Sequence, residues 1–473
     1  MPLSCLRVAR GLLLHGEQIH EGALDREAFM DRIGVRDGSF RTAGIDLGAT
    51  IKTPGLRFFS ASLEKIAFGP GAGLVVGVSI GMASLRAALV DANGWVHHVH
   101  ECEPAQDQLA RDPPELLERI RSAVGAVLSE ALTNDDLLVR KRLPFLGISV
   151  AWCVPMDRRK RPIGPALSSQ MWHNDQGLDK RVATHLGIAS ERSHALADTH
   201  AAAIAFAFAQ TRRSDHVKQR HPRLAIVLRL AGSVGGAIIG VEPPHVDQRL
   251  GPTSGFGRSI LIGAGELAHM PLDRSTVQSY DEGRMPGLGE LVAHRCSCTD
   301  ASEPPDHLEA YTGAAAVAAR IASDEPICTV VRRIVQDASD TTHRRAMEDL
   351  ASLLGHALRG PVALINPAVI ALTGTFAVPT VQKKLAAELS TARSLGDLPT
   401  IEFVSSSSNS PSTMDDRSAS DKTTEQFTRA RGAALVVLRQ HAHRQLAVLV
   451  GQRAGATSQN VKALTSPLAA VPW

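Results

Sequence analysis

The sequence has 473 residues, of which 44% are apolar and 21% are charged, and its formal net charge is +3. This length is sufficient for two or three domains, and the composition is ordinary for a soluble globular protein. Because the net charge is nearly neutral, the composition gives no indication of a polyanionic partner. Evidence for a contact with nucleic acid must therefore come from a local motif.

Two further features concern the compartment. The six cysteines are too sparse for a disulfide scaffold, which favours a reducing cytoplasm. The most apolar stretch, from Leu74 to Val90, is interrupted by Arg86 and by several small residues, so we interpret it as a pair of strands and not as a membrane span. We therefore expect a cytoplasmic protein without a membrane partner.

The first 73 residues lack long β-branched runs and predict short helices. The segment ALDREAFMDRIG predicts a helix with Asp25 as its N-cap and Gly34 as its C-terminal stop. A turn then leads to a candidate helix over Ser39–Leu47, and LRFFSASLEKIAF predicts a strand and a turn after it.

From Leu74 the pattern changes to alternating strands and helices. GLVVGVSIG and SLRAALVDANG predict two strands joined by a glycine-containing turn, and a helix over Pro114–Leu132 precedes the strand LPFLGISVAW. A later strand, LAIVLRLAG, leads into a glycine-rich turn, and PVALINPAVIALTG predicts a helix end, a loop and another strand. This order predicts two α/β lobes.

Cysteine and histidine side chains recur in the second half of the chain. His269 lies in GELAHMPLD, Cys296 and Cys298 form a C-x-C pair, and His307 begins HLEAY. Two thiolates flanked by two imidazoles are the ligand types of a tetrahedral structural zinc site. Because C-x-C is a short motif and the chain has 19 histidines, the alternative is two reduced cysteines near unrelated histidines.

GELAHMPLD, the C-x-C pair, and LEAY followed by Gly313 together resemble the ROK family of bacterial sugar kinases and transcription repressors. That family's pattern is G-E-I-G-H-M, then C-x-C-G-x-x-G-C-L-E-A-Y-x-S-G. Five other stretches follow the family's order, from GVSIGMASLRAALVDANG to NPAVIALTGTFA, so the resemblance covers residues 74 to 445. It implies zinc at His269, Cys296, Cys298 and His307, where His307 replaces the family's last cysteine after a longer loop.

The resemblance also implies the architecture. We expect a two-lobed actin-like ATPase and sugar-kinase fold of the α/β class, preceded by a small α-rich winged helix-turn-helix domain. The predicted domains are the winged helix-turn-helix at 1–73, a first lobe at 74–205, and a second lobe with the zinc site at 206–450. Within the second lobe, the Ser-rich segment 404–426 cannot bury enough surface to order itself and predicts a disordered loop, and 451–473 predicts a flexible tail.

The family's sugar-binding residues map onto four positions of this sequence: Asp198, Glu266, His269 and Glu309. A carboxylate suits this site because it accepts hydrogen bonds from vicinal hydroxyls, and in the family's kinases the residue at Asp198 is the base. Ala197 and His200 replace two asparagines of the family pattern, which puts the identity of the ligand in question. The alternative is that these residues are ordinary solvated polar side chains.

The phosphate side departs further from the family. Kinases of this fold need Asp in the first turn, D-x-G, whereas this chain has Ser79-Ile80-Gly81. The second turn, usually G-T-G, is Ala231-Gly232-Ser233, which removes glycine backbone and a hydroxyl from the phosphate side. Two independent losses on one ligand argue against phosphoryl transfer.

The N-terminal zone distinguishes the branches of the family, because ROK repressors carry a winged helix-turn-helix before the sugar fold. The side chains expected on or beside the recognition helix, where they would reach bases or phosphates, are Arg36, Ser39, Arg41 and Thr42. Gly38 and Gly44 weaken that helix by roughly 1 kcal/mol each relative to alanine. The alternative is a helical extension that no longer binds DNA.

The sequence supports three hypotheses about function. The leading hypothesis is a sugar-responsive ROK-type repressor without enzymatic activity, which binds operator DNA and a sugar or sugar-phosphate effector as a homodimer or homotetramer. The alternative is an ATP-dependent kinase of a hexose or N-acetylhexosamine, with Asp198 as catalytic base. The third is a sugar-binding regulator that acts through protein partners.

Overall fold

In the computed structural model, the described residues are 58–59, 67–68, 74–81, 84–91, 94, 96–102, 113–134, 145–152, 177–212, 223–232, 234–241, 270–272, 274–282, 288–291, 307–321, 325–337, 339–391, 398–404 and 428–438. The helices predicted before residue 58, the predicted loop after Val404, and the predicted tail lie outside these residues. None of the described helices is both long and apolar enough to cross a membrane.

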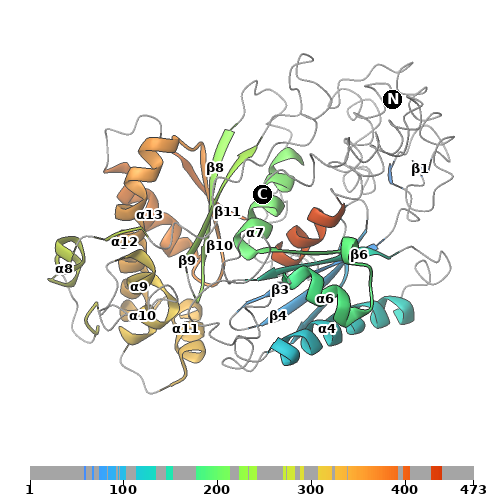
Figure 1. The fold of residues 1–473 in the computed structure, drawn as a ribbon. Helices are drawn as coiled ribbons and strands as arrows, with labels where there is room; N and C mark the ends of the chain where they lie inside the picture. The colour runs from blue at the N-terminus through green and yellow to red at the C-terminus, as the bar shows by residue number, and fades with distance from the viewer. Residues whose placement is uncertain are drawn as a thin grey trace, which may run out of the picture.

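The first lobe is built on a five-stranded sheet with the strand order β5-β4-β3-β6-β7 (Figure 1). Its strands are β3 (Leu74–Ile80), β4 (Leu85–Asp91), β5 (Val96–Cys102), β6 (Phe145–Trp152) and β7 (Ser193–Ala197). The central strand β3 is buried along its whole length, and its sequence LVVGVSI is largely apolar, which is typical of a strand covered on both faces. Helices α4 (Pro113–Asn134) and α6 (Leu178–Leu186) cover one face, and the short helix η3 (Ser190–Arg192) precedes β7.

The second lobe is built on a four-stranded sheet with the order β11-β10-β8-β9. Its strands are β8 (Arg223–Leu230), β9 (Val234–Val241), β10 (Val369–Thr373) and β11 (Thr400–Phe403). The helices of this lobe are α8 (Arg274–Glu282), α9 (Leu308–Thr312), α10 (Ala314–Ala319), α11 (Ile327–Gln336), α12 (Thr341–Ile365) and α13 (Pro379–Ser390). The prediction of a two-lobed α/β protein is therefore confirmed.

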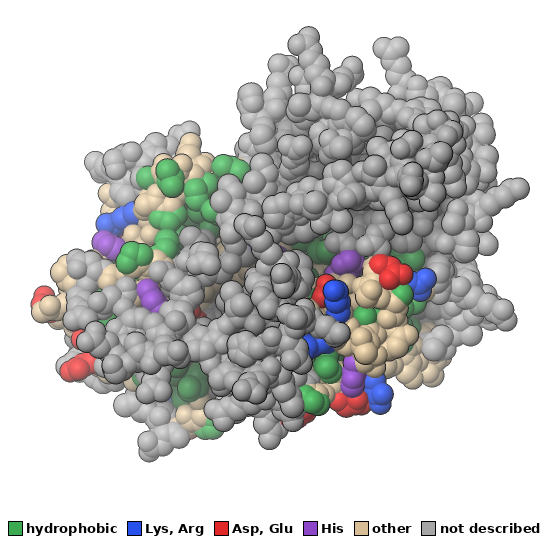
Figure 2. Space-filling view, viewed as in Figure 1, with side chains coloured by type: hydrophobic (Ala, Val, Ile, Leu, Met, Phe, Trp, Pro, Cys, Tyr) green, Lys and Arg blue, Asp and Glu red, His purple; other side chains and the backbone are tan. Residues whose placement is uncertain are grey.

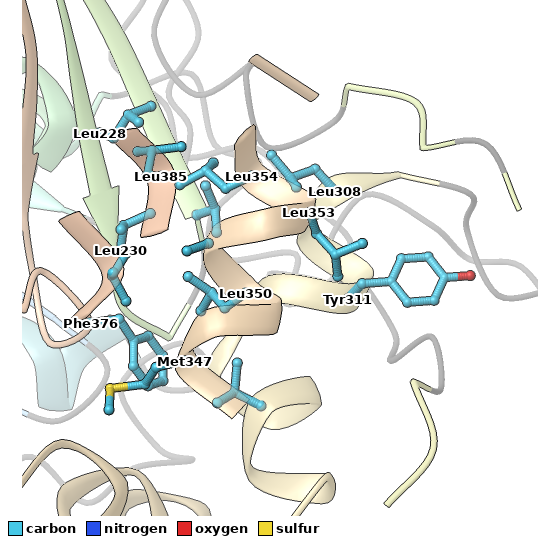
Figure 3. Packing of buried hydrophobic residues seen from close by; sticks show 14 of the residues in the cluster. Leu228, Leu230, Leu308, Tyr311, Met347, Leu350, Leu353, Leu354, Phe376 and Leu385 are labelled. Atoms are coloured by element: carbon cyan, nitrogen blue, oxygen red, sulfur yellow. The ribbon is translucent and has the colours of Figure 1, made fainter. Parts of the chain in front are cut away.

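The core of the second lobe lies between its sheet and α12. Figure 3 shows Leu230 of β8 directed toward Leu350 of α12, and Phe376 beside Met347. These side chains are fully buried or nearly so, and each contributes roughly 1.5–3 kcal/mol by leaving water. This packing holds β8, and with it the residues at the end of β8, in a fixed place.

Helix α7 (Asp198–Arg212) lies between the two sheets (Figure 1). The helix over residues 428–438 packs beside it on the first sheet, although it follows the second sheet in the chain. A Cβ atom at Gly77 of β3 would overlap the carbonyl oxygen of Ala430, so the absence of a side chain lets this helix approach the strand closely. The predicted second lobe, 206–450, includes this helix, and that division of the chain into domains stays a prediction.

A short antiparallel pair precedes the first lobe. Strand β1 (Phe58–Phe59) pairs with β2 (Ala67–Phe68), within LRFFSASLEKIAF, for which the sequence predicts a strand and a turn after the candidate recognition helix. The helices of the predicted winged helix-turn-helix lie outside the described residues. That domain therefore stays a prediction.

The surface around α4 and α6 carries charges of both signs (Figure 2). Arg121 and His185 each lie 3.1 Å from a carboxylate oxygen of Glu118, and Arg119 pairs with Glu115. Exposed pairs of this kind contribute about 0–1 kcal/mol each. In this described part of the surface, positive charge is not concentrated in the way that binding to nucleic acid requires.

Helix α12 begins at a side-chain cap. Asp340 accepts hydrogen bonds from the backbone N–H groups of Thr342 and His343, at 2.7 and 2.9 Å. The bond from His343 lowers the pKa of Asp340 below its ordinary value of 3.8. A lowered pKa means that the ionised carboxylate stabilises the folded state above pH 4, and this contribution is lost as the pH falls through the folded-state pKa.

We therefore expect Asp340→Ala to lower the melting temperature at pH 7, with a difference from wild type that shrinks below pH 4. Asp340→Asn is the control, because asparagine also caps helices but has no charge to titrate. Calorimetric melting between pH 3 and pH 7 measures both. Equal melting temperatures of Asp340→Ala and wild type at pH 7 would contradict the capping role.

Candidate functional site at the junction of the two lobes

Asp198 is the first residue of α7 and directly follows β7. Strands β3, β6 and β7 are parallel, and Ile80, Trp152 and Ala197 lie in register at their carboxyl ends. Asp198 and the turn after Ile80 therefore lie at the same edge of the sheet. Ligands of open α/β sheets bind at the carboxyl ends of the strands.

The Asp198 carboxylate is 2% exposed and is contacted by two arginines. Arg429 donates a hydrogen bond from Nη1 to Asp198 Oδ2 at 3.1 Å. Arg229 Nε also lies 3.1 Å from Oδ2, in an ion pair whose angle does not meet hydrogen-bond geometry. One carboxylate oxygen thus holds two cations.

The two arginines lie against the two turns that the sequence assigns to the phosphate side. In β8, Arg229 is opposite Gly235 of β9. A Cβ atom at Gly235 would overlap the side chain of Thr199 in α7. A Cβ atom at Gly81 would lie 3.7 and 3.8 Å from the Nη atoms of Arg429. Both turns and the start of α7 therefore meet around Asp198.

The first turn contains no carboxylate among its described residues. Ser79 is buried in β3, and its hydroxyl has no hydrogen-bond partner in the described part of the chain. Gly81 N–H donates to Ser84 O at 2.9 Å and closes the turn. A turn that has a neutral hydroxyl, no acidic side chain, and the Arg429 guanidinium near Gly81 is a poor environment for magnesium, which requires anionic oxygen ligands.

Glu309 lies in α9, which is attached to the second turn. The N–H of Ala314 donates to Gly232 O at 3.0 Å, and the N–H of Gly313 donates to Glu309 O at 2.9 Å. A Cβ atom at Gly313 would lie 3.0 Å from Glu309 O and 3.2 Å from Gly232 O, so the backbone leaves little room for a side chain at this position. Glu309 is half-buried.

His307 precedes α9 and is buried. It forms an antiparallel bridge with Pro271, and the N–H of Leu308 donates to Met270 O at 2.9 Å. The chain segment that follows His269 therefore runs beside His307. The sequence-predicted residues outside the described part of the chain are Arg36, Ser39, Arg41, Thr42, Glu266, His269, Cys296 and Cys298.

Sequence reasoning missed both arginines. Arg229 carries a signal, because it is the only charged residue inside the apolar run LAIVLRLAG, and a charge inside a buried strand requires a partner. Arg429 carries none, since it lies 231 positions from Asp198.

A second group of polar side chains lies at the start of α12. Among the described residues, Asp337, Asp340 and His343 bring one ligand atom each within 4.8 Å of one another. The cap of α12 accounts for this arrangement, since Asp340 bonds the first N–H groups and Asp337 accepts from Ser339 and from Asp340 N–H. The Ser339 hydroxyl also lowers the pKa of Asp337.

No family model and no curated protein matches the chain. Among solved structures, the chain is similar to the ROK family transcriptional regulator that is a homologue of the E. coli MLC protein, at 16% identity. This match covers 92% of this chain and 99% of that chain, with a TM-score of 0.49. A ROK family glucokinase from Streptomyces griseus, in complex with glucose and AMPPNP, matches at 15% identity over 77% of this chain and 99% of its own, with a TM-score of 0.47. A ROK family protein from Streptococcus pneumoniae in complex with sucrose matches at 13% over 78% and 99%, with a TM-score of 0.44.

These neighbours are ROK-family proteins. They belong to the family that the sequence motifs resemble, and they include both kinases and a regulator. Described positions that match the ROK pattern include Asp198 at the start of α7, and Met270, Leu308, Glu309, Tyr311 and Gly313 in and around α9.

Proposed function

We propose that this chain is a sugar-responsive transcriptional regulator of the ROK type, which binds operator DNA and a sugar effector and does not transfer phosphate. The observation that carries the proposal is the guanidinium of Arg429 beside Gly81 of the first turn. A kinase needs a carboxylate there to hold magnesium, whereas this chain has Ser79 and a cation.

Sugar binding is proposed at Asp198, Glu266, His269 and Glu309. Asp198 Oδ1 supports it, because both arginine contacts use Oδ2 and a carboxylate has acceptor capacity on each oxygen. The ligand is a sugar or a sugar phosphate. Sugar and DNA affinities are then linked, so that each ligand changes the affinity for the other by the same factor.

DNA binding is proposed for residues 1–73, through Arg36, Ser39, Arg41 and Thr42. A homodimer or homotetramer would place two reading heads on a symmetric operator. We expect Arg41→Ala to weaken binding to a fragment of the neighbouring promoter by roughly tenfold, measured by fluorescence anisotropy with and without added sugars. Arg121→Ala, an exposed arginine of α4, is the control and should bind as wild type.

The contrary results are specific. Folded protein that binds no promoter fragment at any sugar concentration would exclude the regulator. Sugar-dependent release of ADP from ATP, abolished by Asp198→Asn, would establish the kinase in its place.

We propose a structural zinc ion held by His269, Cys296, Cys298 and His307. The burial of His307 and its bridge to Pro271, two residues after His269, support this set. Zinc at four such ligands supplies a tetrahedral cross-link between chain segments.

Purified protein is expected to contain about one zinc per chain by elemental analysis, because four ligands of these types complete the zinc shell. His307→Ala is expected to lose most of the metal and to melt at a lower temperature, whereas His185→Ala of α6 retains both. Wild-type protein without zinc, purified in the absence of chelators, would contradict the site.

A further inference from the structure

Helix α7 is shared by the cores of both lobes. Ala201 packs with Ala433 of the 428–438 helix on the first sheet. Ala202 and Phe206 pack beneath the second sheet with Val227 of β8. The first residue of α7, Asp198, therefore lies between the second sheet and the 428–438 helix on the first sheet.

One arginine contacts Asp198 from each lobe. Arg229 belongs to β8 of the second sheet and is 3% exposed, whereas Arg429 belongs to the helix packed on the first sheet and its side chain is 15% exposed. Both lie 3.1 Å from the same oxygen. A displacement of either sheet relative to the other would separate at least one buried charge from its partner, which is strongly unfavourable.

The two contacts orient the carboxylate. They are both made to Oδ2, and among the described residues no polar atom bonds to Oδ1. A carboxylate held by one oxygen from two directions cannot rotate freely, so the direction of Oδ1 depends on both arginines.

We propose that Arg229 and Arg429 are positioning residues that orient Asp198 for the sugar only while the two lobes meet as they do here. This inference rests on the proposed function, in which Asp198 accepts a hydrogen bond from a sugar hydroxyl. In this proposal, sugar binding and the arrangement of the lobes are coupled through the Asp198 carboxylate and the guanidiniums of Arg229 and Arg429. A sugar that binds Oδ1 stabilises the arrangement in which both arginines reach Oδ2.

The first test uses the full chain without sugar. Amide hydrogen exchange is compared for wild type, Arg429→Gln and the control Arg431→Gln. Arg431 is also buried on the 428–438 helix, but its Nε donates to Gly94 O at 3.0 Å, within the first lobe.

Arg429→Gln is expected to increase exchange in the first turn of α7 and in β8 of the opposite lobe, and Arg431→Gln is expected to leave β8 at wild-type rates. Exchange that increases in Arg429→Gln only within the first lobe would overturn the proposal.

The second test uses calorimetric titration with glucose, N-acetylglucosamine and glucose 6-phosphate. For any of these that binds wild type, Arg429→Gln is expected to weaken affinity about tenfold or more, with Arg431→Gln within about twofold of wild type. Arg429→Lys restores part of the affinity, because it restores the charge without the planar fork. Wild-type affinity in folded Arg429→Gln would overturn the proposal.

The experiments distinguish failure of the proposed sugar binding from failure of the proposed coupling through Asp198. If none of the three sugars binds wild type, the sugar part of the proposed function fails for these ligands, and the exchange experiment still decides whether Asp198 couples the lobes.

Discussion

Replacing Gly432 with alanine is expected to destabilise the protein by about 3 kcal/mol or more. Gly432 lies in the 428–438 helix, where a Cβ atom would overlap the carbonyl oxygen of Ala201 in α7 and lie 3.2 Å from Ala205 Cβ. The obstacle is backbone, so no rotamer change relieves it. On its other side the same helix is held closely against Gly77 of β3, so relief requires opening the contact between helix and sheet.

The matched control is Gly125→Ala in α4, because a Cβ atom there meets nothing within 4 Å. Alanine is the better helix former by about 0.8–1 kcal/mol, so this variant should be as stable as wild type or more stable. Urea unfolding measures both free energies. A Gly432→Ala protein with the stability of Gly125→Ala would show that the helix does not pack as described.

Arg320→Met is expected to cost about 3–5 kcal/mol of unfolding free energy. Arg320 is 2% exposed in the second lobe, and its Nη2 donates to Asp349 Oδ2 at 2.6 Å. Burial raises the pKa of Asp349, and Arg320 and Arg345 oppose that shift. The substitution therefore removes the principal cation that compensates a buried carboxylate.

The sign of the pH dependence follows from the raised pKa. An acid whose pKa is higher in the folded state costs stability as the pH rises through that folded-state value. Because Arg320 opposes the shift, its removal should make Arg320→Met lose more stability between pH 4 and pH 7 than wild type does.

Two controls separate burial from charge. Arg320→Met combined with Asp349→Leu should recover much of the lost stability, because an apolar pair of similar size replaces the ion pair. Glu325→Gln, in the exposed pair with Arg333, should change stability by less than about 1 kcal/mol. A loss in the double variant equal to that in Arg320→Met would exclude the unpaired carboxylate as the cause.

Much of the fold is predictable because the signals are local. GLVVGVSIG predicts a strand, and that strand is β3, which the structure shows to be buried. PVALINPAVIALTG predicts a helix end, a loop and a strand, and Asn366 ends α12 in the left-handed conformation before β10. The existence of α4 was also predicted, with its ends displaced by one or two residues.

The candidate site was predictable only in part. The motifs predict Asp198, His307 and Glu309 as site residues because each family pattern is a short stretch of consecutive residues. They contain no information about Arg229 or Arg429, since an ion pair depends on where distant backbone segments are placed and not on their neighbours in the sequence.

By itself, the sequence determined the alternation of strands and helices, the two lobes, and the absence of an acidic residue from Ser79-Ile80-Gly81, because each is a property of consecutive residues. Only the tertiary structure decided that the 428–438 helix returns to the first sheet and brings Arg429 to Asp198. Glycine at positions 77 and 432 permits a close approach of backbone, but the partner in that approach is chosen by long-range packing. The contact that joins the lobes is therefore a consequence of the fold as a whole.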